Sequence, residues 1–204
     1  MKNTKTGLLF GVTAYVLWGL FPLYWPLLEP ADALEIVGHR AVWSLAFCVI
    51  ALAATKAIKP AIATMRRPKV FLKLLAATAL ISVNWIVYIW ATNNGHVVEA
   101  SLGYYINPII IIAIGVLLLK EKMRKLQWAS VSIAALGVLV LTIDYGRLPW
   151  VALALALSWG TYGFIKKQLG LGALEGLGIE TAIAAPFYLA YLTWIGVEGS
   201  GHFG

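Results

Sequence analysis

The sequence predicts an all-α membrane protein, a polytopic bundle of helices that cross the bilayer. Hydrophobic residues make up 61% of the 204 residues and charged residues only 12%, which is too little charge to cover the surface of a soluble domain. The apolar residues also come in repeated runs of about 20, the length of helix that crosses a hydrocarbon layer ~30 Å thick. The short alternating segments of a membrane β-barrel are absent from the sequence.

Seven apolar runs are long enough to cross the bilayer. The first follows the polar start MKNTKT, as the apolar part of a signal peptide would. It is too long for one, however, and it carries Trp18, Pro22 and Trp25 without a small-residue cleavage site, so we interpret it as an uncleaved span. The predicted spans are residues 7–28, 34–55, 70–92, 97–119, 126–143, 149–165 and 173–195.

The breaks between the predicted spans carry turn residues or charges. In chain order they read EPAD, KAIKPAIATMRRPK, NNGH, KEKMRK, DYGRLP and KKQLGLG. Because most of these loops are short, we expect neighbouring helices to run antiparallel in a compact bundle.

The positions of the basic residues predict the orientation in the membrane. The N-terminus and the even-numbered loops hold Lys2, Lys5, Lys56, Lys59, Arg66, Arg67, Lys69, Lys73, Lys120, Lys122, Arg124, Lys125, Lys166 and Lys167. The odd-numbered loops hold Arg147 and the acids Glu29, Asp32, Asp144 and Glu198. Basic loops stay in the cytoplasm, so the N-terminus is predicted to be cytoplasmic and the C-terminal end of these seven spans extracytoplasmic. This loop pattern accounts for the net charge of +7, and no nucleic acid is expected as a partner.

An internal repeat relates the two ends of the chain. Residues 33–47, ALEIVGHRAVWSLAF, and residues 173–187, ALEGLGIETAIAAPF, agree at five positions with a constant offset. The preceding spans also correspond, with Trp18 matched to Trp159. Five spans separate the two units, so the second unit enters the membrane from the opposite side, as in the inverted repeats of transporters.

The repeat divides the chain into two predicted domains. Residues 1–146 form the first five-helix repeat, and residues 147–204 hold the first two helices of a second repeat. The second unit would need three more helices to be complete.

Residues 84–108, NWIVYIWATNNGHVVEASLGYYINP, place amides, aromatic rings and a carboxylate between two apolar runs. A side-chain amide facing lipid has no hydrogen-bond partner, so these groups should point into the bundle. Two interpretations stay open, a polar cavity between spans three and four or hydrogen bonds that only hold helices together. The aligned polar positions are Asn84, Tyr88, Ser101, Tyr104 or Tyr105, and Asn107 or Pro108.

Two carboxylates are candidates for proton coupling. Glu99 lies in the first turn of its span, where it either stabilises the helix by interacting with the helix dipole or binds substrate or protons. Glu180 is the most deeply membrane-embedded carboxylate and occupies the position equivalent to Arg40 in the repeat. We expect Arg40 to snorkel to the interface, with an Arg40–Glu99 ion pair as an alternative.

The sequence contains no enzyme signature. There is no G-x-S-x-G, H-E-x-x-H, P-loop or cysteine cluster, and His39, His96 and His202 are far apart. We therefore expect no catalytic activity, no cofactor and no metal.

Four segments carry a resemblance to a known family. They are EIVGHRAVWSL at 35–45, NWIVYIWATNNGHVVEASLGYYINP at 84–108, LQWASVSIAALGV at 126–138 and LPWVALALALSWGTYGFIKK at 148–167. The chain resembles the RarD branch of the EamA-type transporters, in the drug/metabolite transporter superfamily. The resemblance implies ten membrane helices in two inverted five-helix repeats, and an inner-membrane permease that works by alternating access. Carried onto this chain, the implied substrate cavity is lined by Trp18, Asn84, Tyr88, Glu99, Ser101, Tyr104, Asn107, Trp159 and Tyr162.

The same comparison implies that helices eight, nine and ten are missing, so we interpret the chain as a fragment. A homodimer that completes the bundle is the alternative. The predicted function is secondary transport of a small metabolite or drug across the lipid bilayer. The alternatives are a non-transporting membrane scaffold and an inactive piece of a transporter.

Overall fold

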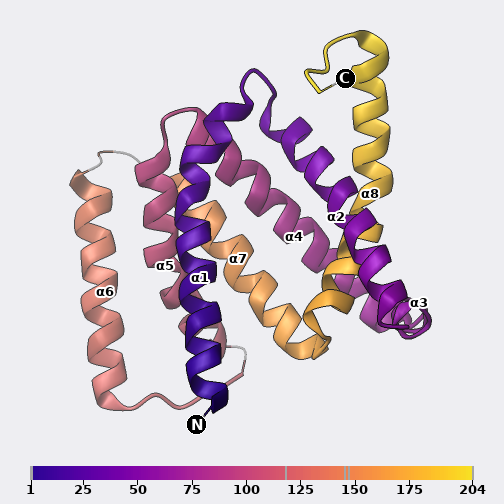
Figure 1. The fold of residues 1–204 in the computed structure, drawn as a ribbon. Helices are drawn as coiled ribbons and strands as arrows, with labels where there is room; N and C mark the ends of the chain where they lie inside the picture. The colour runs from indigo at the N-terminus through magenta and orange to yellow at the C-terminus, as the bar shows by residue number, and fades with distance from the viewer. Residues whose placement is uncertain (1, 118, 145, 147, 204) are drawn as a thin grey trace.

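A computed structural model describes residues 2–117, 119–144, 146 and 148–203 (Figure 1). Within these residues the regular elements are all helical. They are α1 (Lys2–Tyr24), the 3₁₀ helix η1 (Trp25–Leu28), α2 (Ala33–Ala54), α3 (Ile58–Met65), α4 (Pro68–Asn93), α5 (Val97–Leu117), α6 (Lys125–Asp144), α7 (Trp150–Leu169) and α8 (Ala173–Glu198).

The structure confirms the prediction of a helical membrane bundle. Six of the seven predicted spans coincide with one long helix each, to within a few residues at either end. Five of these are long and apolar enough to cross a membrane, namely Thr6–Leu28, Ala33–Ala54, Pro68–Asn93, Val97–Leu117 and Lys125–Asp144. Helices α7 and α8 are of similar length; α7 packs against α4 and α5, and α8 packs against α2 and α4.

Local chemistry explains where the helices begin and end. The Asp32 side chain accepts a hydrogen bond from the Glu35 amide at 2.8 Å, which caps α2 at the predicted EPAD turn. Helix α7 ends at Gly170, whose φ of +61° is the left-handed conformation that glycine adopts without a steric penalty. Turn residues and caps therefore place these ends where the sequence predicted them.

The structure differs from the prediction at two places. The first span is not one helix, because Pro26 has no amide hydrogen and α1 gives way to η1 just before it. The predicted loop between spans two and three contains the two-turn helix α3. Pro60 lies in the first turn of α3, where an amide hydrogen is not needed, and Ala61 is buried in a cluster with Leu74 and Ile179.

Helices α4 and α7 form the centre of the bundle. Helix α4 packs against α7 and α8, α7 packs against α5, and α8 packs against α2. Helices α1 and α6 lie at the outside, as Figure 1 shows, and none of the described α6 residues is buried. The N-terminus and the C-terminus lie at opposite ends of the bundle (Figure 1), as an odd number of crossings requires.

Helices α2 and α8 run antiparallel. Tyr191, late in α8, donates a hydrogen bond to Asp32 at the start of α2, while Thr64, after α2, donates to Glu175 in the first turn of α8. The two helices begin at Ala33 and Ala173, the equivalent residues of the sequence repeat. The division into domains at residues 146 and 147 stays a prediction, and Arg147 lies outside the described residues.

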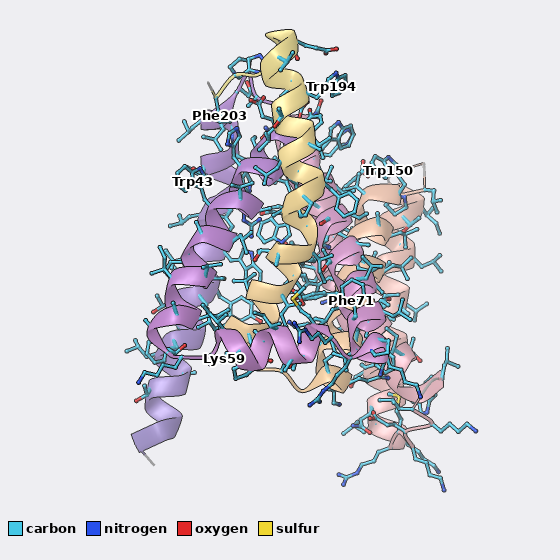
Figure 2. All side chains as sticks on the ribbon, turned by 90° about the vertical axis from the view of Figure 1, so that its right-hand side faces the viewer. Trp43, Lys59, Phe71, Trp150, Trp194 and Phe203 are labelled. Carbon is cyan, nitrogen blue, oxygen red and sulfur yellow. The ribbon has the colours of Figure 1, made fainter. Side chains whose placement is uncertain are left out.

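Both ends of the bundle carry the side chains expected there. Figure 2 shows Trp150, Trp194 and Phe203 towards one end, and Lys59 on the other end with Phe71 nearby. Tryptophan residues near a membrane interface and basic residues in cytoplasmic loops are typical of a helix bundle that is embedded in a bilayer.

Helices α5 and α7 approach each other closely at Gly103. A Cβ atom on this residue would lie 3.0 Å from the Ala152 carbonyl oxygen and 3.1 Å from the Leu155 Cβ. Because one of these atoms belongs to the backbone, it cannot rotate away. Small residues at such crossings are what allows membrane helices to pack tightly.

We therefore expect Gly103→Ala to be destabilising relative to a matched change. Gly137 on α6 has nothing within 4 Å of its Cβ position, so Gly137→Ala gains helix propensity without a clash. Thermal unfolding in detergent should place the two variants about 1–3 kcal/mol apart, with Gly103→Ala the less stable. Equal stability would show that the α5–α7 contact is looser than described here.

Candidate functional site

A cavity of about 200 Å³ lies between α2, α4, α7 and α8. On α4, Thr78, Ile81, Ser82 and Trp85 recur every three or four residues, so they share one helix face. The lining combines aromatic rings with hydroxyl and charged groups. Its polar and aromatic members are Arg40, Ser44, Thr78, Ser82, Trp85, Trp159, Tyr162, Glu180, Thr181 and Tyr188.

One side of the cavity holds an ion pair whose carboxylate is buried and whose lysine is partly buried. The Glu180 carboxylate, only 4% exposed, lies 2.7 Å from the Lys166 ammonium nitrogen and accepts a hydrogen bond from the Tyr162 hydroxyl at 3.1 Å. The lysine and the tyrosine come from α7, and the glutamate comes from α8. The lysine therefore neutralises the carboxylate, which could not otherwise stay charged at low cost in this setting.

Arg40 lies elsewhere in the lining, on α2. Its guanidinium carbon is 3.3 Å from the centroid of the Trp85 ring, a cation–π contact. Its Nη1 is buried and has no hydrogen-bond partner among the described residues. The expectation that Arg40 snorkels to the interface is therefore wrong, because the Trp85 ring on the neighbouring helix holds the guanidinium inside the bundle.

The predicted ion pair between Arg40 and Glu99 is not formed. Within the described residues no carboxylate lies within ion-pair distance of Arg40, and the Glu99 carboxylate lies 3.0 Å from Nδ1 of His96. Glu99 follows His96 by three residues, so the two side chains meet on one face at the start of α5.

Aromatic rings pack against Trp85. Trp25 and Phe21 meet Trp85 edge to face, with ring centroids 6.3 and 6.2 Å away. A second cavity, of about 510 Å³, adjoins this cluster and is lined by Trp25, His39, Arg40 and Phe203 among others. Arg40 thus lines both cavities.

Three of the predicted substrate-binding residues lie in or beside the first cavity, in addition to Glu180. Trp159 and Tyr162 line it. The Trp18 ring contacts Trp159 edge to face at 5.4 Å. This contact brings α1 to the cavity wall. That Trp18, Trp159 and Tyr162 contact a substrate stays a prediction.

Asn84 forms hydrogen bonds between helices, one of the two interpretations that the sequence left open. Its amide nitrogen donates to the Leu155 carbonyl at 3.1 Å and to the Ser158 hydroxyl at 2.9 Å. It therefore joins α4 to α7 and is absent from the residues that line the cavity. The physical reason is helical periodicity, because Asn84 faces α7 whereas Ser82 and Trp85 face the cavity.

The other predicted residues also lie outside the cavity lining. Tyr88 is buried against Tyr104, with ring centroids 6.1 Å apart. Ser101 is exposed and donates to the Val97 carbonyl within its own helix. Asn107 lies against Gly160 of α7, and its Oδ1 is buried without a hydrogen-bond partner among the described residues. A cavity between spans three and four is therefore replaced by one between α2, α4, α7 and α8, while any role of these residues in binding stays a prediction.

Sequence reasoning missed several lining residues. Arg40 could have been found, because it is a charged residue within a span and is equivalent to Glu180 in the repeat. The hydroxyl groups gave no signal, because serine and threonine are common in membrane helices. The missed polar residues are Arg40, Ser44, Thr78, Ser82, Thr181 and Tyr188.

Known proteins identify the family. Residues 5–143 match the EamA-like transporter family. The chain belongs to this family. As an EamA protein it has RarD-type relatives, which confirms the family resemblance found in the sequence.

Three relatives illustrate the similarity. Protein RarD of Streptomyces exfoliatus is 51% identical over 99% of this chain and 64% of its own length. Uncharacterized transporter YojE of Bacillus subtilis is 45% identical over 95% of this chain and 66% of its own length. Protein RarD of Escherichia coli K12 is 37% identical over 100% of this chain and 69% of its own length. The chain thus spans about two thirds of the length of these EamA relatives, and no solved structure matches it.

The described residues contain no group of three or more His, Cys, Asp or Glu side chains that could hold a metal ion. The expectation of no metal, no cofactor and no catalytic activity stays a prediction.

Proposed function

We propose that the complete EamA protein is a secondary carrier of small metabolites or drugs, and that its substrate occupies the cavity between α2, α4, α7 and α8. The observation that carries this proposal is a cavity with charged and aromatic lining inside an apolar helix bundle. Polar groups at membrane depth are costly, and where they occur they mark binding sites and ion pathways. A scaffold needs no such interior.

The carrier works by alternating access, with the two repeats moving against each other around the cavity. Helices α2 and α8 begin at equivalent repeat positions and each contributes one charged residue to the lining, Arg40 and Glu180. The aromatic rings of Trp85, Trp159 and Tyr162 would contact an apolar part of the substrate.

Proton coupling is assigned to Glu180 in preference to Glu99. Both carboxylates are buried, but only Glu180 lines the cavity. It can exchange its Lys166 and Tyr162 contacts for a proton when the helices move. The protein would sit in the inner membrane with a cytoplasmic N-terminus, because its basic loops follow the positive-inside pattern. Dimerisation stays a candidate, to be tested by crosslinking in membranes.

Flux in reconstituted vesicles tests the carrier proposal. We expect vesicles that contain the full protein to take up at least one member of a radiolabelled metabolite panel faster than empty vesicles do. Vesicles preloaded with the unlabelled solute should also take up the labelled solute by counterflow, because a carrier exchanges solute across the membrane without an energy source. Correctly inserted protein that moves nothing would favour the scaffold instead.

Cysteine accessibility tests alternating access directly. Ser44 lines the cavity, and Ser130 lies on the exposed surface of α6. In a background without Cys48, we expect Ser44→Cys to react with a membrane-impermeant maleimide from both sides of the membrane in turn. Ser130→Cys, surrounded by lipid, should stay unlabelled. Labelling of Ser44→Cys from one side only, even in the presence of a transported substrate, would contradict alternating access.

A further inference from the structure

The charges that line the cavity do not cancel. Arg40 and Glu180 are the only charged residues among the described lining residues. Glu180 is neutralised by Lys166 at 2.7 Å, whereas Arg40 has no carboxylate partner in the described part of the chain. The cavity therefore carries one uncompensated positive charge.

Arg40 lines the cavity and has at least one N–H donor without a partner among the described residues. The Trp85 ring covers one face of the guanidinium at 3.3 Å. Stacking of this kind fixes the plane of the group without using its N–H donors. The buried Nη1 donates to nothing in the described residues, although a buried donor without a partner costs free energy.

From this we infer that the cavity binds small monoanions, with a carboxylate group paired to the Arg40 guanidinium and an aromatic or apolar body against Trp85 and Trp159. An arginine held flat by a ring presents the two parallel N–H groups that a carboxylate accepts. A dianion would bring a second charge for which the lining offers no free cation, so a single charge fits best. As a statement about the transported substrate, the inference rests on the carrier function proposed above.

Arg40 also lines a second cavity. It lines both the cavity of about 200 Å³ and the adjoining one of about 510 Å³. An anion that enters through the second cavity therefore meets the same guanidinium that holds it in the first.

Binding of three ligands with the same ring tests the inference. Benzoate is a monoanion, benzamide is neutral and benzylamine is a cation. Radiolabelled benzoate is bound to the full protein in detergent and then displaced by each unlabelled ligand. The affinities of benzamide and benzylamine measured in this way should be at least about tenfold lower than the affinity of benzoate, because each loses a charge-assisted hydrogen bond. Equal displacement by benzamide, or no benzoate binding at all, would overturn the inference.

Variants then assign the effect to Arg40. Arg40→Met keeps the length of the side chain and removes its charge, so benzoate affinity should fall at least about tenfold. Arg40→Lys, which keeps the charge but loses the planar group, should be intermediate. The matched control is Arg66→Met, since Arg66 is exposed beyond α3. The Arg66→Met variant should bind benzoate with the same affinity as the unmodified protein. Unchanged affinity in Arg40→Met would place the anion elsewhere. If Arg40→Met fails to fold, Arg40→Lys and the benzamide comparison on the unmodified protein decide.

Flux of the same ligands separates this inference from the carrier proposal. Benzoate that binds in an Arg40-dependent manner but is not transported would leave the anion site standing and count against the carrier. Benzamide transported as fast as benzoate would support the carrier and overturn the selectivity for monoanions.

Discussion

Lys166→Met is expected to lower the free energy of unfolding by about 3–5 kcal/mol, because it leaves the buried Glu180 carboxylate without its cation. The two charged groups are 2.7 Å apart and Glu180 is 4% exposed. The Tyr162 hydroxyl still donates at 3.1 Å, but one neutral hydrogen bond does not offset the loss of an ion pair. Thermal or denaturant-induced unfolding of the purified protein in detergent measures the change.

The chain offers a close control for this change. Lys167 is the neighbouring residue on α7 and is exposed, so Lys167→Met should leave stability nearly unchanged. The double variant Lys166→Met/Glu180→Gln removes the unpaired charge and should recover a large part of the loss, which a double-mutant cycle quantifies. Equal effects of the two lysine variants, or no recovery in the double variant, would mean that the pair is not buried as described.

Trp85→Ala is expected to lower the free energy of unfolding by about 2–3 kcal/mol, less than for a fully buried aromatic side chain, because Trp85 is partly buried and lines a cavity. The ring contacts Phe21, Trp25 and Tyr88 at centroid distances of 6.2, 6.3 and 6.1 Å. It also supports the Arg40 guanidinium at 3.3 Å. The substitution thus removes packing among α1, η1 and α4, and it frees the arginine from its fixed plane.

Trp194 provides the matched control for Trp85. It lies on α8 and is 56% exposed, so Trp194→Ala should change stability by less than about 1 kcal/mol. Trp85→Phe keeps a ring beside Arg40 and should retain part of the lost stability. A Trp85→Ala variant as stable as Trp194→Ala would contradict the description of this aromatic cluster as a packed part of the bundle.

The helices could be predicted from the sequence because the signals that set them are local. About 20 apolar residues are needed to cross the bilayer, so each apolar run of that length predicts a membrane span. Asp32 and Gly170 lie at helix ends for reasons that depend only on their own side chains and backbone. The early end of α1 before Pro26 is local in the same sense, and could have been read from the proline.

The positions of side chains around the cavity could not be obtained in the same way. Asn84 and Ser82 are two residues apart on one helix, and the sequence does not state which of their faces meets α7 and which meets the cavity. Apolar residues occur on all faces of a membrane helix, so the hydrophobic periodicity that indicates the buried face of a helix in soluble proteins is weak here. Arg40 was misplaced for this reason, because only the approach of Trp85 from α4 makes the interior a favourable place for its charge.

The sequence alone determined the class of protein, the positions of the long helices to within a few residues and the family, because length, hydropathy and short motifs are properties of the chain itself. Only the tertiary structure decided which polar groups share a cavity. The pairing of Lys166 with Glu180 and the stacking of Arg40 on Trp85 join residues on different helices. Such contacts depend on how each helix is rotated in the bundle, and packing against its neighbours sets that rotation.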